Sequence, residues 1–306
     1  MKLCYKCRQE IKGDTPVKHG LHPDCFNQWF DLPPEAEEDF KNLSLKPELS
    51  ETATRVMESF YHGNFKKYSA TLGGKSYILK IPHEDPNLAK SEYLCNQIAS
   101  SLGLTVPKYF LIQFMDQEDC FLSYNFMQDY EAATLKHIYH YLKPEEEFSV
   151  VMLIKVIEAQ TGRLSEVKKF INLCLFDALI GNHDRHGRNL GLIITAYKKV
   201  LSPCYDNPSY LGLEDEKYIA AHHEPRGKIF TESSKEPVMK AYAQEFIHLG
   251  YKESLKEFFG KIDTSQLEKL IEDAFLSQKR KTAFNTLMTR RYGELRDALK
   301  YRLYPD

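Results

Sequence analysis

The stretch Gly181-Asn-His-Asp-Arg-His-Gly-Arg-Asn189 decides the fold class of this 306-residue chain. A helical pattern over residues 165–180 precedes it, and the apolar segment 190–195, typical of a strand, follows it directly. A polar loop held between two regular elements presents its side chains in fixed positions, as a reactive loop requires. Within this loop Asp184 and Asn189 stand five positions apart.

That spacing is the one found in the catalytic loop of protein kinases, D-x-x-x-x-N. There the aspartate orients and deprotonates the attacking hydroxyl, and the asparagine reaches a Mg²⁺ ion on the phosphates. Asp206 follows Asn189 by seventeen residues, at the end of another predicted strand, where a second metal-binding carboxylate belongs. Taken alone, Asp206 is more typical of a helix cap or turn. Together with Asp184 and Asn189 it predicts a phosphotransferase site.

A lysine and a glutamate in the first third of the chain extend this pattern. Lys80 lies on the predicted strand 76–81 and matches the lysine that holds the α- and β-phosphates of ATP in kinases. Glu92, on the predicted helix 87–102, is its candidate ion-pair partner. The alternative for Lys80 is a solvated residue on a strand edge.

Three of the seven cysteines lie within the first 25 residues, in the pairs Cys4-x2-Cys7 and His22-x2-Cys25. Two such pairs are typical of a tetrahedral zinc site. Four protein ligands leave no open coordination position, so zinc here would be structural. The alternative is a small cysteine-containing β-hairpin in which His22 and Cys25 are buried packing residues. The pattern leaves both open.

The composition indicates a globular protein without a large charged surface. Hydrophobic residues make up 42% of the chain, and 41 basic against 43 acidic residues give a formal charge of −2. We therefore expect no direct binding of nucleic acid and no membrane contact, and no apolar run approaches the ~20 residues of a membrane-spanning helix. The N-terminus lacks the features of a secretory signal, and the odd number of cysteines favours reduced thiols, so we expect a cytoplasmic location.

The chain divides into four predicted regions. Residues 1–30 form the Cys/His knuckle, residues 31–55 an acidic linker with one short helix, residues 56–127 a small lobe, and residues 128–306 a mostly helical lobe. The predicted elements of the small lobe are a hairpin over 68–81 that turns at Gly73-Gly74, a helix over 87–102, and strands over 109–113 and 120–126. In the helical lobe we expect one strand-turn-strand interruption within 190–205 and a final helix from 264 to 301, capped by Thr264 or Ser265.

These residues resemble the HipA-like serine/threonine protein kinases of bacterial toxin–antitoxin systems. The resemblance is carried by Lys80, Glu92, the loop 181–189 and the segment Ser202-Pro-Cys-Tyr-Asp206. The cysteine-histidine opening, the segment Ser91-Glu-Tyr-Leu-Cys95 and the turn up to Pro107 are also similar to family members. The resemblance implies an α+β, two-lobed protein-kinase-like fold with a small mixed β/α N-lobe and a mostly helical C-lobe.

The family also implies a role for each site residue. Asp184 is the catalytic base, Asn189 and Asp206 hold Mg²⁺, and Lys80 binds the phosphates of ATP. The hinge that faces the adenine is formed by Tyr124, Asn125 and Phe126. The other cofactor-binding candidates are Glu92, Gly63, Lys67, His186 and Arg188. For the last two, a packed loop histidine and a solvated arginine are the alternatives.

Two departures from the family pattern bear on regulation. The β-rich N-terminal subdomain that precedes the kinase lobe in full-length HipA proteins is missing before Phe60. This is typical of the short, HipT-like type of the three-gene system, in which a separate small antitoxin-like protein resembles the missing subdomain and acts with a helix-turn-helix DNA-binding partner. In the phosphate-covering loop Gly63 and Lys67 remain, but Phe60 and His62 replace the family's regulatory serines.

The resemblance implies a kinase toxin that uses ATP and Mg²⁺, phosphorylates a tryptophanyl or glutamyl aminoacyl-tRNA synthetase and so inhibits translation. The residues themselves select no substrate. One alternative is a pseudokinase, a regulatory module that binds nucleotide or a partner without phosphotransfer. Phosphotransfer to a small molecule also remains open, whereas the slightly negative charge disfavours a zinc-knuckle nucleic-acid adaptor.

Overall fold

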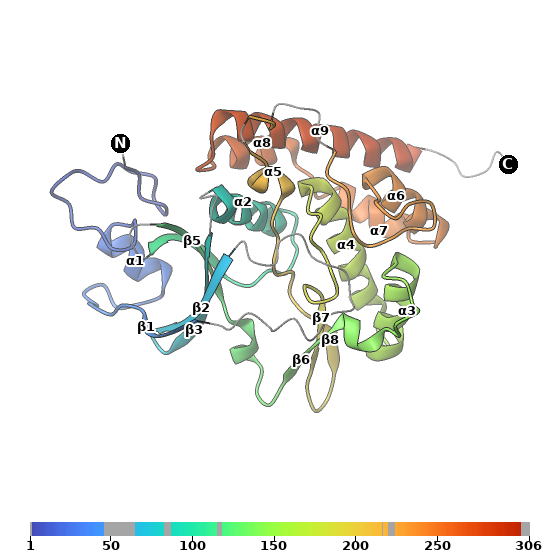
Figure 1. The fold of residues 1–306 in the computed structure, drawn as a ribbon, viewed down its shortest axis with the longest axis horizontal. Helices are drawn as coiled ribbons and strands as arrows, with labels where there is room; N and C mark the ends of the chain where they lie inside the picture. The colour runs from blue at the N-terminus through green and yellow to red at the C-terminus, as the bar shows by residue number, and fades with distance from the viewer. Residues whose placement is uncertain are drawn as a thin grey trace.

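The computed structural model describes residues 2–45, 65–82, 87–114, 118–215, 217–219 and 224–300. They form two lobes, one built around a five-stranded sheet and one mostly helical (Figure 1). None of the described helices combines the length and the apolar character that a bilayer crossing requires.

The N-lobe sheet is antiparallel, with the strand order β1-β2-β3-β5-β4. Its strands are β1 (Lys41–Leu45), β2 (Phe65–Leu72), β3 (Lys75–Pro82), β4 (Tyr109–Phe114) and β5 (Glu118–Tyr124). The predicted hairpin is confirmed as β2 and β3. Its two turn residues, Gly73 and Gly74, have φ of +55° and +73°, a left-handed conformation that suits glycine and matches the twist of a tight hairpin.

The alternation along β3 assigns its side chains to two different faces of the sheet. Lys80 pairs across the strands with Lys67 and Phe121, and cross-strand partners share a face. Helix α2 (Asn87–Ser101) covers this face, and the chain leaves the helix at Gly103, whose φ is +70°. Tyr77 and Leu79 point to the opposite face, where they are buried.

That opposite face is covered by the N-terminal knuckle and its helix α1 (Pro23–Trp29). The ring of Phe30 lies 4.6 Å from that of Phe110 and 5.7 Å from that of Tyr77, measured between centroids. The knuckle and the sheet therefore share one hydrophobic core.

The described part of residues 31–55, for which a linker with one short helix is predicted, contains a strand. Residues 41–45 form β1, in which Lys41 pairs with Thr71 of β2, and no helix occurs in residues 31–45. Phe40 explains the difference, because its ring packs against Phe26 and Phe30 and holds the following residues at the sheet edge. The acidic residues within 35–39 favoured the interpretation as a linker, and nothing in the sequence indicated the contact made by Phe40. Residues 46–55 lie outside the described residues.

The C-lobe contains most of the helices and a small three-stranded sheet, β6-β7-β8. Its helices are α3 (Val150–Thr161), α4 (Leu164–Ile180), α5 (Tyr210–Leu213), α6 (Met239–His248), α7 (Lys252–Phe259), α8 (Thr264–Glu272) and α9 (Gln278–Lys300); its strands are β6 (Thr134–His137), β7 (Gly191–Ile194) and β8 (Lys199–Leu201). The strand-turn-strand interruption is confirmed by β7 and β8. No strand is predicted over residues 134–137, and β6 is a short strand that pairs with β7.

Two further boundaries differ from the prediction. The strand β5 ends at Tyr124, and Phe126 begins a 3₁₀ turn, η2 (Phe126–Asp129). The predicted final helix is two helices, α8 and α9. The cap of α8 is Asp263, whose carboxylate accepts a hydrogen bond from the Gln266 N–H at 3.1 Å. Between the two helices the ring of Phe275 packs against Tyr5 of the knuckle.

Candidate functional site

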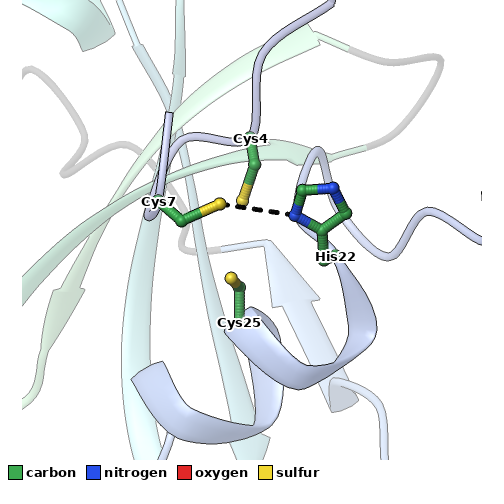
Figure 2. A group of neighbouring side chains, drawn as sticks. All are labelled: Cys4, Cys7, His22 and Cys25. Carbon is green, nitrogen blue, oxygen red and sulfur yellow. Dashed lines mark hydrogen bonds between the residues drawn. The ribbon is translucent and has the colours of Figure 1, made fainter. Parts of the chain in front are cut away.

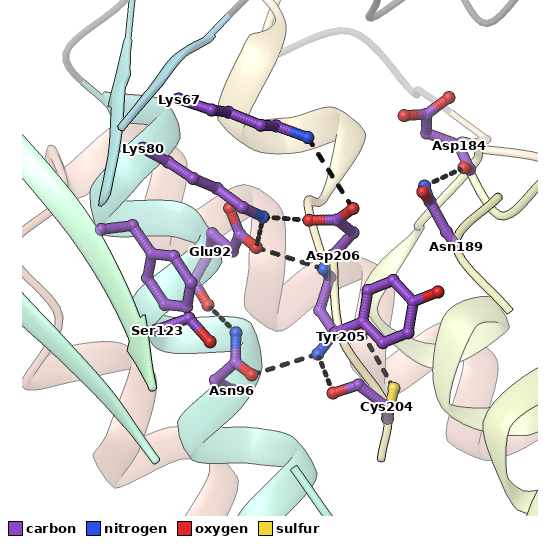
Figure 3. A network of polar contacts seen from close by, with 12 residues as sticks. Lys67, Lys80, Glu92, Asn96, Ser123, Asp184, Asn189, Cys204, Tyr205 and Asp206 are labelled. Carbon is purple, nitrogen blue, oxygen red and sulfur yellow. Dashed lines mark hydrogen bonds and ion pairs between the residues drawn. The ribbon is translucent and has the colours of Figure 1, made fainter. Parts of the chain in front are cut away.

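Three charged side chains from different elements meet between the lobes: Lys80 on β3, Glu92 on α2 and Asp206 after β8 (Figure 3). The Lys80 Nζ donates to Glu92 Oε1 at 2.5 Å and also donates to Asp206 Oδ1. Lys80 is only 5% exposed and Glu92 is fully buried. Lys80 is therefore a buried site residue, and the alternative of a solvated edge lysine is excluded.

Lys80 and Asp206 hold each other in the charged form, whereas burial raises the pKa of the Glu92 carboxyl above its ordinary value. Burial opposes the charge of Lys80, but Asp206 and Glu92 outweigh it and raise the pKa of the Lys80 ammonium above its ordinary value. Burial likewise opposes the charge of Asp206, but Lys67 and Lys80 hold the pKa of the Asp206 carboxyl well below its usual range. Lys67 Nζ lies 3.9 Å from Asp206 Oδ2. The site thus holds two cations and a carboxylate that are all able to contact a polyphosphate and its metal ion.

The loop between α4 and β7 places Asp184 and Asn189 beside this cluster. The side-chain amide of Asn189 donates to the Asp184 backbone oxygen at 3.0 Å, which closes the loop across the five-residue spacing. The Asp184 N–H donates to the side-chain oxygen of Asn182 at 2.9 Å. In Figure 3 the Asp184 carboxylate points away from the Asn189 amide.

A buried arginine inside the loop, Arg185, joins it to the segment that carries Asp206. Arg185 is 1% exposed, and its guanidinium forms two hydrogen bonds with the Asp177 carboxylate, at 2.8 and 2.9 Å. It also donates to the Tyr205 backbone oxygen at 2.6 Å and to the Asn207 side-chain oxygen at 2.7 Å. Sequence reasoning missed this role. The available signal was Asp177, a lone carboxylate in the apolar end of α4, which requires a buried partner.

Asn207 extends the connection to α2. Its side-chain amide donates to Asn96 Oδ1 at 3.1 Å, and its backbone N–H donates to Glu92 Oε1 at 3.4 Å. Between these anchored neighbours, Asp206 has a φ of +52°, a left-handed conformation that aspartate tolerates better than most residues. The backbone conformation that presents the Asp206 carboxylate is therefore held from both sides.

The predicted hinge residues lie in different positions. Tyr124 pairs with Tyr77, so its side chain is on the knuckle face of the sheet, opposite Lys80. Asn125 donates its N–H to the Ser76 backbone oxygen at 3.0 Å. The ring of Phe126 packs against Tyr205 with centroids 5.8 Å apart, next to Asp206. Phe126 therefore contacts the segment that carries Asp206.

The remaining candidates have mixed outcomes. His186 accepts a hydrogen bond from the Arg188 N–H at 3.1 Å through Nδ1, and its Nε2 lies 4.0 Å from Asp184 Oδ1. His186 therefore braces the loop. The backbone oxygen of Arg188 accepts a hydrogen bond from the Tyr205 hydroxyl at 2.9 Å. Gly63, and the positions Phe60 and His62 of the phosphate-covering loop, lie outside the described residues.

The knuckle forms a second cluster of functional groups, separated from the first by the sheet (Figure 2). The ligand atoms of Cys4, Cys7, His22 and Cys25 all lie within 4.8 Å of one another. Burial raises the pKa of the Cys25 thiol to about 12. For Cys4, burial is outweighed by hydrogen bonds from backbone N–H groups, and the pKa falls to about 7. Three sulfurs and one imidazole at this separation fit a tetrahedral zinc ion after a small contraction.

Comparison with known proteins places this geometry in a family. The family of the HipA-like C-terminal domain matches residues 52–277. The Helicobacter pylori proinflammatory kinase CtkA is similar in structure, with a TM-score of 0.64 and 18% identity over 76% of this chain and 92% of that one. HipA of Shewanella oneidensis MR-1, solved in a toxin–antitoxin complex with HipB and operator DNA, has a TM-score of 0.57 and 13% identity over 89% of this chain and 77% of that one.

No curated protein sequence matches the chain. The structural likenesses confirm the predicted two-lobed, kinase-like fold. Because the matched segment covers well over half of the sequence and contains Lys80, Glu92, Asp184, Asn189 and Asp206, the chain belongs to the family of the HipA-like C-terminal domain.

Proposed function

We propose that this chain is an ATP- and Mg²⁺-dependent serine/threonine protein kinase. The observation that carries the proposal is the 2.5 Å ion pair between Lys80 and Glu92, formed in the same site as Asp206. In protein kinases this ion pair and the metal-binding aspartate must both be in place for transfer. Family membership supports the same reaction.

Each residue of the site has its own role in the proposed reaction. Lys80 and Lys67 bind phosphate oxygens, and Asp206 and Asn189 hold Mg²⁺, which neutralises charge on the phosphates when bound. Asp184 accepts the proton of the acceptor hydroxyl. Arg185 keeps the loop and the metal-binding segment in register through its hydrogen bonds to Asp177 and to the Tyr205 backbone.

We further propose that the protein is a cytoplasmic toxin of the short, HipT-like type. HipA of Shewanella oneidensis was solved with HipB and operator DNA. This supports the proposal that the present chain also has an antitoxin and a DNA-binding partner. The partners proposed here are a small antitoxin-like protein and a helix-turn-helix DNA-binding protein. The proposed substrate is a tryptophanyl or glutamyl aminoacyl-tRNA synthetase, whose phosphorylation stops translation.

The test is transfer of labelled phosphate from ATP with Mg²⁺ to proteins of a bacterial lysate. We expect a labelled band with the wild type and none with Asp184→Ala. Asp297→Ala, which removes a 62% exposed carboxylate far along α9, is the matched control and keeps the band. Binding of ATP by the wild type without any transfer would replace this proposal with the pseudokinase alternative.

We also propose that Cys4, Cys7, His22 and Cys25 hold one structural Zn²⁺ ion. The support is the donor set itself, four soft or borderline ligand atoms gathered within 4.8 Å by residues that do not touch the kinase site. Metal analysis of protein purified without a chelator tests it. One zinc per chain is expected, and its absence would leave the four residues as packing residues.

A further inference from the structure

Helix α2 must be held in one position for Glu92 to reach Lys80, and the residue before Glu92 meets an unusually close neighbour. Gly212 on α5 lies against Ser91, which is fully buried. A Cβ atom added to Gly212 would lie 2.4 Å from both the Cβ and the Oγ of Ser91. Non-bonded carbon atoms pack at about 3.5–4.0 Å, so any residue larger than glycine would push the two helices apart.

The partner helix α5 is fixed on the C-lobe. Its first residues are tied down by Ser209, whose hydroxyl donates to the Ile180 backbone oxygen at 2.6 Å. Its last residues are tied down by Arg280 of α9, which is 2% exposed and donates to the backbone oxygens of Leu211 at 2.5 Å and Glu214 at 2.9 Å. Figure 1 shows α5 between α2 and α9, and it contacts both.

The two helices that meet at this contact, α5 and α2, are anchored differently. The groups that anchor α5 come from α4 and α9, both part of the main C-lobe core. The helix α2 contacts both lobes: Ala89 packs with residues of the sheet, and Leu94 and Ile98 pack in the C-lobe core. A steric clash at Gly212 would strain the contact between α5 and α2, and Glu92 lies one residue from the point of contact.

We infer that Gly212 is a positioning residue that holds α2, through its contact with Ser91, in the place where Glu92 pairs with Lys80. The buried Arg280 contributes to this role because its hydrogen bonds keep α5 in position. This inference rests on the proposed kinase function, because it assigns the phosphate-binding role to the Lys80–Glu92 pair.

Gly212→Ala tests the inference in steady-state phosphate transfer. A displacement of about 1 Å at the reacting groups costs roughly 10²-fold in rate, so we expect kcat/KM for ATP to fall by about that factor, with KM raised as well as kcat lowered. The double variant Ser91→Gly with Gly212→Ala removes the clash and should recover at least tenfold. Gly293→Ala, on α9 with nothing within 4 Å of the added Cβ, is the matched control and should retain wild-type activity.

A second readout does not depend on phosphate transfer. The rate at which Lys80 is acetylated by acetic anhydride, followed by mass spectrometry, should rise in Gly212→Ala and return toward wild type in the double variant, with all proteins shown to be folded by their melting temperatures. Unchanged Lys80 reactivity in Gly212→Ala, or a loss that Ser91→Gly does not relieve, would overturn the inference. If the wild type transfers no phosphate, the kinase proposal fails while the Lys80 reactivity still decides the role of Gly212.

Discussion

The two faces of the N-lobe sheet are built from the same strands but hold different chemistry. On the face toward α2, Lys80 is buried among carboxylates and lies within reach of the partly exposed Lys67. On the other face, Tyr77 and Leu79 are buried against the aromatic core of the knuckle. Because side chains alternate along β3, one strand supplies both a charged site and a hydrophobic core. We therefore expect that a substitution on one face of the sheet can change the charged site or the hydrophobic core without changing the other.

The largest effect is expected on the charged face, from Asp184→Asn. Loss of the proton acceptor should lower kcat for phosphate transfer by about 10²–10⁴-fold, while the affinity for Mg²⁺-ATP stays within a few-fold of wild type. Transfer assays and titration with a non-hydrolysable ATP analogue measure the two quantities. An equal loss of nucleotide affinity would mean that Asp184 belongs to the binding machinery and not to the proton transfer.

On the knuckle face, Phe30→Ala should cost about 3–5 kcal/mol in the free energy of unfolding, because a buried ring is lost from the shared core. Phe30 is 1% exposed, whereas Leu164 is 57% exposed, so Leu164→Ala serves as the control with little expected loss. Urea unfolding gives both values. Activity per folded molecule should remain within about twofold of wild type, and a loss of kcat comparable to that of Asp184→Asn would break the separation of the two faces.

The zinc proposal provides another test of whether the knuckle face of the sheet serves stability and not phosphate transfer. Cys7→Ser should abolish stoichiometric zinc, and a metal present at a hundred times its Kd stabilises the fold by about 2.7 kcal/mol, which this variant would lose. The matched variant Cys174→Ser, in the C-lobe core, should keep one zinc per chain. Metal analysis and thermal unfolding with and without a chelator measure the effect. Chelation that stops transfer in a protein that stays folded would contradict a purely structural role.

The smallest effect concerns the exposed ion pair between Asp31 and Lys75, at 2.9 Å, which joins the knuckle to the start of β3. Lys75 and Lys108 hold the pKa of the Asp31 carboxyl below its ordinary value. Its stabilising contribution is therefore present above about pH 4 and is lost as the pH falls through the lowered pKa of the folded state. Exposed pairs contribute about 0–1 kcal/mol, so Asp31→Asn should lower the urea midpoint slightly at pH 7 and not at pH 2. A larger loss at pH 2 would contradict this sign.

Local spacing carried the predictions that the structure confirms. The turn at Gly73-Gly74 has positive φ, and the helical patterns over residues 87–102 and 165–180 are confirmed as α2 and α4. A turn joins Cys4 to Cys7, and the start of α1 joins His22 to Cys25, so each pair forms locally. Such features depend on residues a few positions apart, which periodicity and turn chemistry describe well.

The loop 181–189, the hairpin and the pairs Cys4–Cys7 and His22–Cys25 could be recognised from the sequence alone. Only the tertiary structure decided that Lys80 meets Asp206, 126 positions away, and that Gly212 touches Ser91. The same holds for β1 and β6, which are strands only because β2 and β7 pair with them. The physical reason is that these contacts are set by packing between segments distant in the chain, where burial and cross-strand pairing override local preference.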